Sequence, residues 1–160
     1  GAGGSAPKHV EQMLKEGRLR WDSLGEYCAL VPALELAATR TSNQRASVLA
    51  KTLERAIGLY LAEDRLPSRH VNKMDNRGST FYLALYWAKA LAKQNEDTEL
   101  QSRFLVVAEK LEKNEAVIAK ELLEVQGQPV DIGGYYHPDD TLAERVMRPS
   151  MTFNAIIDAA

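Results

Sequence analysis

The sequence predicts a mainly α-helical protein, and two observations carry that prediction. Apolar residues recur every three to four positions along most of the 160 residues, which is the spacing that places them on one face of an α-helix. Strand signals are weak, and Gly133 and Gly134 make the region that contains them more typical of a loop than of a strand. We expect about five principal helices and short C-terminal helices in a single segment, residues 1–160.

The first helix is expected to run from about Ala6 to Glu16. Ser5 is a suitable N-cap, and Pro7 is tolerated in a first turn because the N–H that it lacks would be unpaired there in any case. Gly17 then ends the helix. Residues 1–9 are interpreted as a glycine-rich loop, which precedes this helix and overlaps its first residues.

Two capping boxes predict the next two helices. Ser-x-x-Glu at residues 23–26 predicts a helix toward Thr39, and Thr-x-x-Gln at residues 41–44 predicts the one that follows. Pro32 should kink the earlier helix because proline has no N–H to donate. Cys28 lies on that same apolar helix, so we interpret it as a packing residue and not as a nucleophile.

The most apolar segment, residues 81–92, is expected to form the central and mostly buried helix. Residues 63–79 precede it as a polar loop, which carries three arginines and a histidine and is too long and too charged to be a mere turn.

The C-terminal third predicts one long helix and an irregular tail. Residues 97–125 have continuous helical periodicity, and Gly127 and Pro129 should end that helix. Residues 126–160 are expected to be irregular apart from two short helices near 141–147 and 150–159.

Composition excludes several classes of function. A net charge of −2 argues against a general nucleic-acid or membrane-surface binder. No apolar run approaches the roughly 20 residues of a membrane span. The single Cys28 allows no internal disulfide and fits a reducing cytoplasm, where we expect the protein to act. The first residues lack the pattern of a signal peptide.

The glycine-rich segment before Lys8 and His9 indicates an anion site. Glycine lets backbone N–H groups approach a ligand, a helix start offers unpaired donors, and the basic side chains add charge. The alternative is a flexible terminus that only bridges to the helix. The match of residues 1–6 to the dinucleotide fingerprint G-x-G-x-x-A lacks the strand that this motif requires. With no Met and no strand before it, the segment suggests a piece of a longer polypeptide.

Residue spacing gives no metal site and no catalytic set. There is no H-E-x-x-H motif and no Cys-His cluster, and Asp139 and Asp140 are adjacent residues whose side chains diverge.

Five strings in order resemble the C-terminal portion of the monomeric-type NADP-dependent isocitrate dehydrogenases. They are GAGGSAPKH at 1–9, LRWDSLGE at 19–26, DNRGS at 75–79, FYLALYWA at 81–88 and VDIGGYY at 130–136. The resemblance implies that the chain is the last part of the larger, nucleotide-binding domain. That parent domain resembles the α/β isocitrate/isopropylmalate dehydrogenase-like fold.

The family oxidises isocitrate to 2-oxoglutarate and CO₂ with NADP and Mg²⁺ or Mn²⁺. The resemblance implies a site for the adenosine side of NADP made of Gly4, Ser5, Ala6, Lys8 and His9. It also implies that His9, Arg20 and Arg69 surround the 2′-phosphate and that Asp22 lies beside that pocket. Three basic groups would select against NAD, whose hydroxyl leaves buried charge uncompensated.

The resemblance further implies that the substrate, metal and catalytic residues lie outside this chain, which should be inactive alone and should not bind the metal itself. The expected partners are NADP and the remainder of the polypeptide, without nucleic acid or membrane. The alternative is a non-catalytic helical interaction module that lost the ligand, whose exposed apolar face would drive self-association.

Overall fold

The computed structural model describes the backbone of residues 2–160 and the side chains from residue 6 onward. This range contains eight helices and no strand, which confirms the mainly α prediction. The helices are α1 (Ala2–Glu16), α2 (Leu24–Thr41), α3 (Gln44–Ala62), α4 (Asn76–Lys93), α5 (Thr98–Lys113), α6 (Glu115–Glu124), α7 (Asp140–Met147) and α8 (Met151–Asp158). Every helix in this described range is too short or too polar to cross a bilayer.

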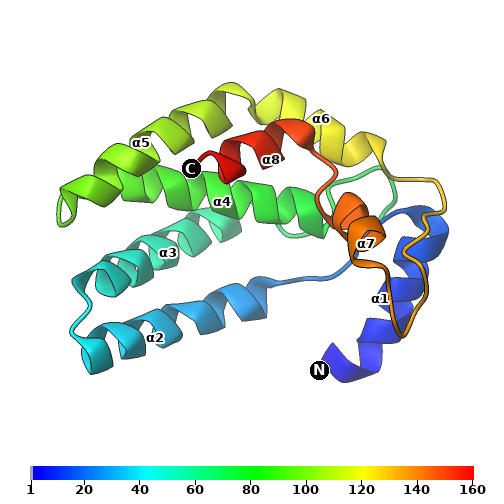
Figure 1. Cartoon of the computed structure of the whole chain (residues 1–160), viewed down its shortest axis with the longest axis horizontal. Helices are drawn as coiled ribbons and strands as arrows, with labels where there is room; N and C mark the ends of the chain where they lie inside the picture. The colour runs from blue at the N-terminus through cyan, green and yellow to red at the C-terminus, as the bar shows by residue number, and fades with distance from the viewer. Residues whose placement is uncertain (1) are drawn as a thin grey trace.

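The helices α2 to α5 lie side by side, and α1 and α7 stand at one end of this bundle (Figure 1). The helix α4 packs against α3, α5 and α6, while α8 packs on α5 and α6. The predicted central and mostly buried helix is therefore confirmed, since α4 packs against three other helices and nearly all of its residues are buried or half-buried. The main core cluster draws on α3, α4, α5 and α6 through Leu53, Tyr60, Phe81, Leu85, Leu111 and Ile118.

The first helix starts earlier than predicted. It includes residues 2–9, so the expected loop is helical and Ser5 is not its N-cap. Glycine costs only about 1 kcal/mol relative to alanine in a helix, and each residue added to an existing helix gains a hydrogen bond. Gly1 and the side chains of residues 2–5 lie outside the described part, as does the fingerprint match at Gly1.

The helix end at Gly17 is confirmed. Its φ of +60° is left-handed, and its N–H donates to the carbonyl of Met13 at 2.9 Å. A Cβ here would meet the carbonyl oxygens of Gln128 at 2.7 Å and Val125 at 2.9 Å. Glycine is therefore needed both for the turn and for the close approach of the C-terminal tail.

Neither predicted capping box forms. Ser23 precedes α2 without a side-chain cap, because its hydroxyl accepts a hydrogen bond from Asn76 instead. Asn43, two residues after the predicted Thr41, caps α3 by accepting from the N–H of Ala46. The helix α2 continues through Pro32 as far as Thr41.

Two further boundaries differ from the prediction. The polar loop ends at Asp75, which caps α4. Residues 76–79, the last four of the expected loop, are therefore helical. The predicted long helix is divided at Asn114, whose side chain and N–H both donate to the carbonyl of Lys110. Asparagine side chains compete in this way with the backbone pattern of a helix. Residues 126–139 are irregular as expected.

The helix α2 is apolar but has no buried residue. Its outward residues include Ala29, Leu30, Ala33, Leu36 and Ala37, whose spacing places them on one face. The prediction that Cys28 packs in the core is wrong, because this thiol is exposed. The helix pattern was correct, but α3 covers only the opposite face of α2.

A buried ion pair joins α4 to the end of the bundle where α1 lies. Asp75 and Arg77 are 1% and 5% exposed, and Arg77 Nη2 lies 2.7 Å from Asp75 Oδ2. The same carboxylate accepts from the N–H of Leu19 at 3.0 Å. Arg77 also donates to the carbonyls of Gly17 at 2.8 Å and Val146 at 2.7 Å.

We predict that Asp75→Ala destabilises the chain by about 3–5 kcal/mol, because it leaves the Arg77 charge buried without its partner. Urea unfolding followed by circular dichroism measures this loss. The matched control is Glu124→Ala, which breaks the exposed pair with Lys120 and should leave the midpoint nearly unchanged. Equal effects of the two substitutions would contradict the importance of the buried pair.

Tyr60 gives the core a dependence on alkaline pH. It is fully buried, its hydroxyl has no hydrogen-bond partner within the described residues, and burial raises its pKa to about 12. An unfolded tyrosine has a pKa of about 10. The folded state therefore holds this proton more tightly, so the associated stability is complete below pH 10 and is lost as pH rises toward 12.

Tyr60→Phe should remove that loss, which is on the order of 2 kcal/mol between pH 10 and 12. Stability measured across this range should fall less steeply in Tyr60→Phe than in the wild type. Tyr136→Phe is the control, because Tyr136 is 86% exposed. Identical pH profiles for the wild type and Tyr60→Phe would refute the assignment.

Candidate functional site

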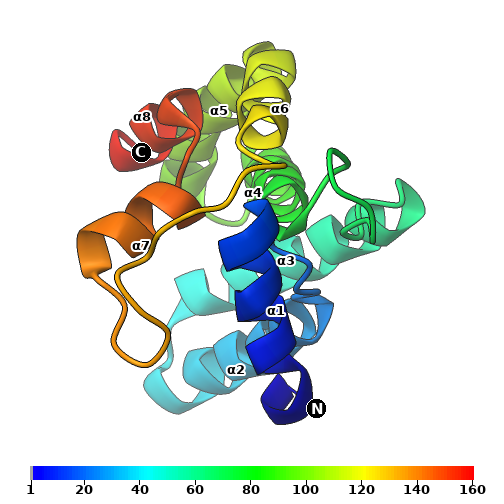
Figure 2. The same cartoon turned by 90° about the vertical axis from the view of Figure 1, so that its right-hand side faces the viewer.

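Three of the predicted basic residues surround one open hollow. Lys8 and His9 project from α1 and Arg20 from the segment after it, around a cavity of about 650 Å³. Figure 2 shows α1 along the near end of the bundle, and residues of this helix form most of the lining. The described lining consists of Lys8, His9, Glu11, Gln12, Lys15, Glu16 and Arg20.

The acidic side chains of the hollow already have partners on α1. Glu11 lies 2.5 Å from Lys15, and this hydrogen bond lowers the pKa of Glu11. Glu16 accepts from Gln12 at 2.9 Å. Within the described residues, Lys8 and Arg20 form no ion pair, so their charges remain open to an anion.

His9 is held against the ring of Trp21. The two ring centroids are 5.3 Å apart at an interplanar angle of 77°, and Nδ1 of the half-buried His9 has no hydrogen-bond partner within the described residues. The Trp21 indole donates to Glu26 at 3.2 Å. Trp21 does not line the hollow, so this contact joins α1 to the segment that carries Arg20.

The helical conformation of residues 2–9 changes the predicted contact. Ala6, Lys8 and His9 lie inside α1 rather than at its start, so the hollow does not lie at the helix N-terminus. Recognition of an anion then depends on side chains more than on free backbone N–H groups. Gly4 and Ser5 are on the same helix, outside the described lining.

Asp22 and Arg69 do not line the hollow as described. Asp22 is exposed and accepts from the N–H of Leu24 at 3.0 Å. Arg69 is exposed on the loop 63–75, which Gln126 holds through the N–H of Asn72 and the carbonyl of Lys73.

That loop is nevertheless anchored next to α1. Gly127 follows Gln126 and donates to the carbonyl of Glu16 at 2.7 Å. Val130 donates to the carbonyl of Leu14 at 3.0 Å. The tail thus ties the base of the loop that carries Arg69 to the helix that carries Lys8 and His9.

Sequence reasoning missed the residues that hold the Arg20 segment. Asp75 and Asn76 both bind it, through the N–H and the carbonyl of Leu19 respectively. Both residues belong to a string used only for the resemblance. An aspartate directly before an apolar helix is a typical N-cap, which could have indicated the start of α4 but not its partner segment.

Arg18 is fully buried, unlike its neighbour Arg20. Within the described residues its guanidinium nitrogens have no hydrogen-bond partner, and burial lowers its pKa. The arginines at 18 and 20 therefore differ completely in access, and only Arg20 can meet a ligand in the hollow without a change of structure.

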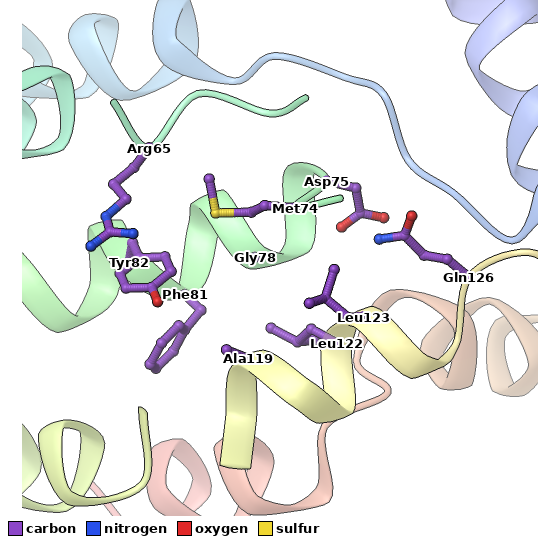
Figure 3. Close-up of a pocket in the computed structure, with 10 residues that line it drawn as sticks. All are labelled: Arg65, Met74, Asp75, Gly78, Phe81, Tyr82, Ala119, Leu122, Leu123 and Gln126. Carbon is purple, nitrogen blue, oxygen red and sulfur yellow. The ribbon is translucent and has the colours of Figure 1, made fainter. Parts of the chain in front are cut away.

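A second cavity, of about 240 Å³, lies between α4, α6 and the loop 63–75. Figure 3 shows Arg65 and Tyr82 at one end and Asp75 and Gln126 at the other. Arg65 lies 3.8 Å over the Tyr82 ring and donates to Tyr86, while Asp75 and Gln126 are committed to the contacts described above. The rest of the lining is mostly apolar, which makes this cavity a poorer anion site than the open hollow.

No group of three or more His, Cys, Asp or Glu side chains in the described residues is arranged to hold a metal ion. We therefore assign no residue of the described part to Mg²⁺ or Mn²⁺ and derive no step through either metal.

Comparison with known proteins covers nearly the whole chain. A family model described as monomeric isocitrate dehydrogenase matches residues 1–158. The chain is 57% identical over 159 residues to an NADP isocitrate dehydrogenase of Mycobacterium tuberculosis and to one of Colwellia maris, and 56% identical over 157 residues to that of Azotobacter vinelandii. These alignments cover 98–99% of this chain but 21% of each relative. The chain thus spans about a fifth of the length of these relatives.

Proposed function

Because this chain belongs to the monomeric isocitrate dehydrogenase family, we propose that it contributes the adenosine 2′-phosphate side of the NADP site in such an enzyme. The relatives named above are NADP isocitrate dehydrogenases. The observation that carries the proposal is the hollow where Lys8, His9 and Arg20 meet. Arg69, on the loop anchored beside α1, is the fourth basic contributor. Asp22 belongs to the same segment as Arg20.

The chemistry of these residues fits a phosphate dianion. Arg20 offers a planar fork of N–H donors, Lys8 a mobile ammonium group, and His9 a ring nitrogen without an internal partner. Charge-assisted hydrogen bonds of this kind are the stronger ones in proteins. NAD, with a hydroxyl in place of the phosphate, would leave these cations uncompensated, so the site favours NADP.

The complete reaction is the oxidation of isocitrate to 2-oxoglutarate and CO₂, with NADP accepting the hydride and a divalent metal assisting. Hydride transfer needs substrate and nicotinamide in contact. We assign this chain the binding and orientation of the adenosine end only, and we expect no oxidation of isocitrate by the 160 residues alone.

The second proposed partner is the remainder of the longer polypeptide. The apolar outer face of α2 has Leu30 and Leu36 exposed at 42% and 50%, with Ala33 between them. An apolar face of this kind on a folded protein is typical of an interface. The free, exposed Cys28 fits the cytoplasmic location that we propose.

We predict that the chain binds NADP more tightly than NAD and that Arg20→Ala lowers the ratio of the two affinities by about 10- to 100-fold. This range corresponds to the loss of a hydrogen bond to a charged group. Arg20→Lys should fall between, because it keeps the charge and loses the fork. Titration calorimetry with each nucleotide measures the ratio.

Arg55→Ala is the matched control for this substitution, since Arg55 is exposed on α3 and outside the hollow. It should leave the ratio at the wild-type value. A folded wild-type chain that binds both nucleotides equally, or neither of them, would contradict the proposal.

We also predict that the isolated chain self-associates through α2 at high concentration and that Leu36→Lys shifts it toward monomer. Leu105→Lys, at a similarly exposed leucine of α5 (48%), should have a smaller effect. Sedimentation velocity distinguishes the two variants. A tight oligomer whose melting temperature NADP does not change would favour the alternative function, a non-catalytic helical interaction module.

A further inference from the structure

We propose that Asn76, the first residue of α4, is a positioning residue for Arg20 and His9 and thereby sets the preference for NADP over NAD. This inference rests on the proposed function, because it assigns a role toward the same hollow. Asn76 itself does not line the hollow. It acts through the backbone on both sides of Arg20.

Three hydrogen bonds connect Asn76 to the segment that carries Arg20. Its N–H donates to the carbonyl of Leu19 at 2.9 Å. Its side-chain nitrogen donates to the carbonyl of Trp21 at 2.9 Å and to the hydroxyl of Ser23 at 2.8 Å. The residues before and after Arg20 are therefore both bound to the same residue.

Only a side chain with two N–H donors on one atom makes the last two bonds together. Asparagine provides them at the length of one methylene, and the residue is 7% exposed, so water does not compete freely for these carbonyl and hydroxyl groups. Its Oδ1 faces the hydroxyl of Thr80, one turn along α4. The amide orientation is thus consistent with donors toward residues 21 and 23.

The same amide reaches His9 through Trp21. The Trp21 carbonyl is held by Asn76, and its ring stands edge-on to the His9 ring. Loss of the amide would remove the bond that holds the backbone of Trp21, whose ring contacts His9. Two of the basic groups that line the hollow, His9 and Arg20, are therefore linked to one buried side chain.

A purely structural role predicts a different result from a positioning role. The side-chain donors of Asn76 end in residues 21–23, whereas α4 is capped by Asp75 and packed by its own core residues. Removing the amide should loosen the Arg20 segment while α4 stays in place. Affinity for a ligand that contacts Arg20 should then fall more than affinity for one that does not.

The test is the ratio of NADP to NAD affinity in the folded 160-residue chain, measured by titration calorimetry well below the melting temperature. Asn76→Ala should lower this ratio about fivefold, less than the loss of a whole charged hydrogen bond. Asn43→Ala is the matched control, because it removes a side-chain bond at the start of α3. It should leave the ratio within about twofold of the wild type, as a general loss of stability would not separate the nucleotides.

The double variant Arg20→Ala with Asn76→Ala shows whether the effect passes through Arg20. If it does, Asn76→Ala should have little further effect on the ratio in the Arg20→Ala background. Asn76→Asp provides a second variant that suits a helix start and keeps the backbone bond but loses both N–H donors. It should lower the ratio at least as much as Asn76→Ala.

Each outcome separates the two claims. If Arg20→Ala lowers the ratio and neither Asn76 variant does, the positioning role is overturned and the proposed function stands. If both effects add in the double variant, the route through Arg20 is wrong. If the folded wild type shows no preference for NADP, the proposed function itself fails, and the inference fails with it.

Discussion

The position of the segment that carries Arg20, at the hollow beside α1, depends on the buried pair of Asp75 and Arg77. The carboxylate caps α4, pairs with Arg77 and accepts from the N–H of Leu19, while Arg77 reaches the carbonyls of Gly17 and Val146. One ion pair thus joins α4, the segment after α1 and the end of α7. In a medium of low dielectric, breaking the pair would leave a buried charge without its partner, so the geometry forms as a unit.

Helix content and order were predictable because apolar residues recur with the period of a helix, and in α3 and α4 these residues form the buried face. The helix boundaries were less predictable, because they depend on hydrogen bonds to groups far away in the sequence. Ser23 fits a capping box, yet its hydroxyl serves Asn76, 53 residues later. The exposed Cys28 shows the same limit, because an apolar helix does not reveal which face a neighbour will cover.

The candidate site was partly predictable for a related reason. Lys8 and His9 are adjacent in the sequence. The resemblance added Arg20, which the structure places at the same hollow. Composition could not show that Arg18 is buried while Arg20 is exposed, because burial depends on which distant segments pack together. The contacts of Asn76 were missed because the sequence does not show which distant groups a side chain will bind.

The central claim is that the segment carrying Arg20 belongs to the cooperative core and is not a loose connector. Native-state hydrogen exchange of the Leu19 amide, which donates to Asp75, tests it most directly. We predict that Leu19 exchanges with the same free energy of opening as the buried Leu85 of α4. Exchange of Leu19 through a low-energy local opening, while Leu85 remains protected, would show that the segment is a loose connector.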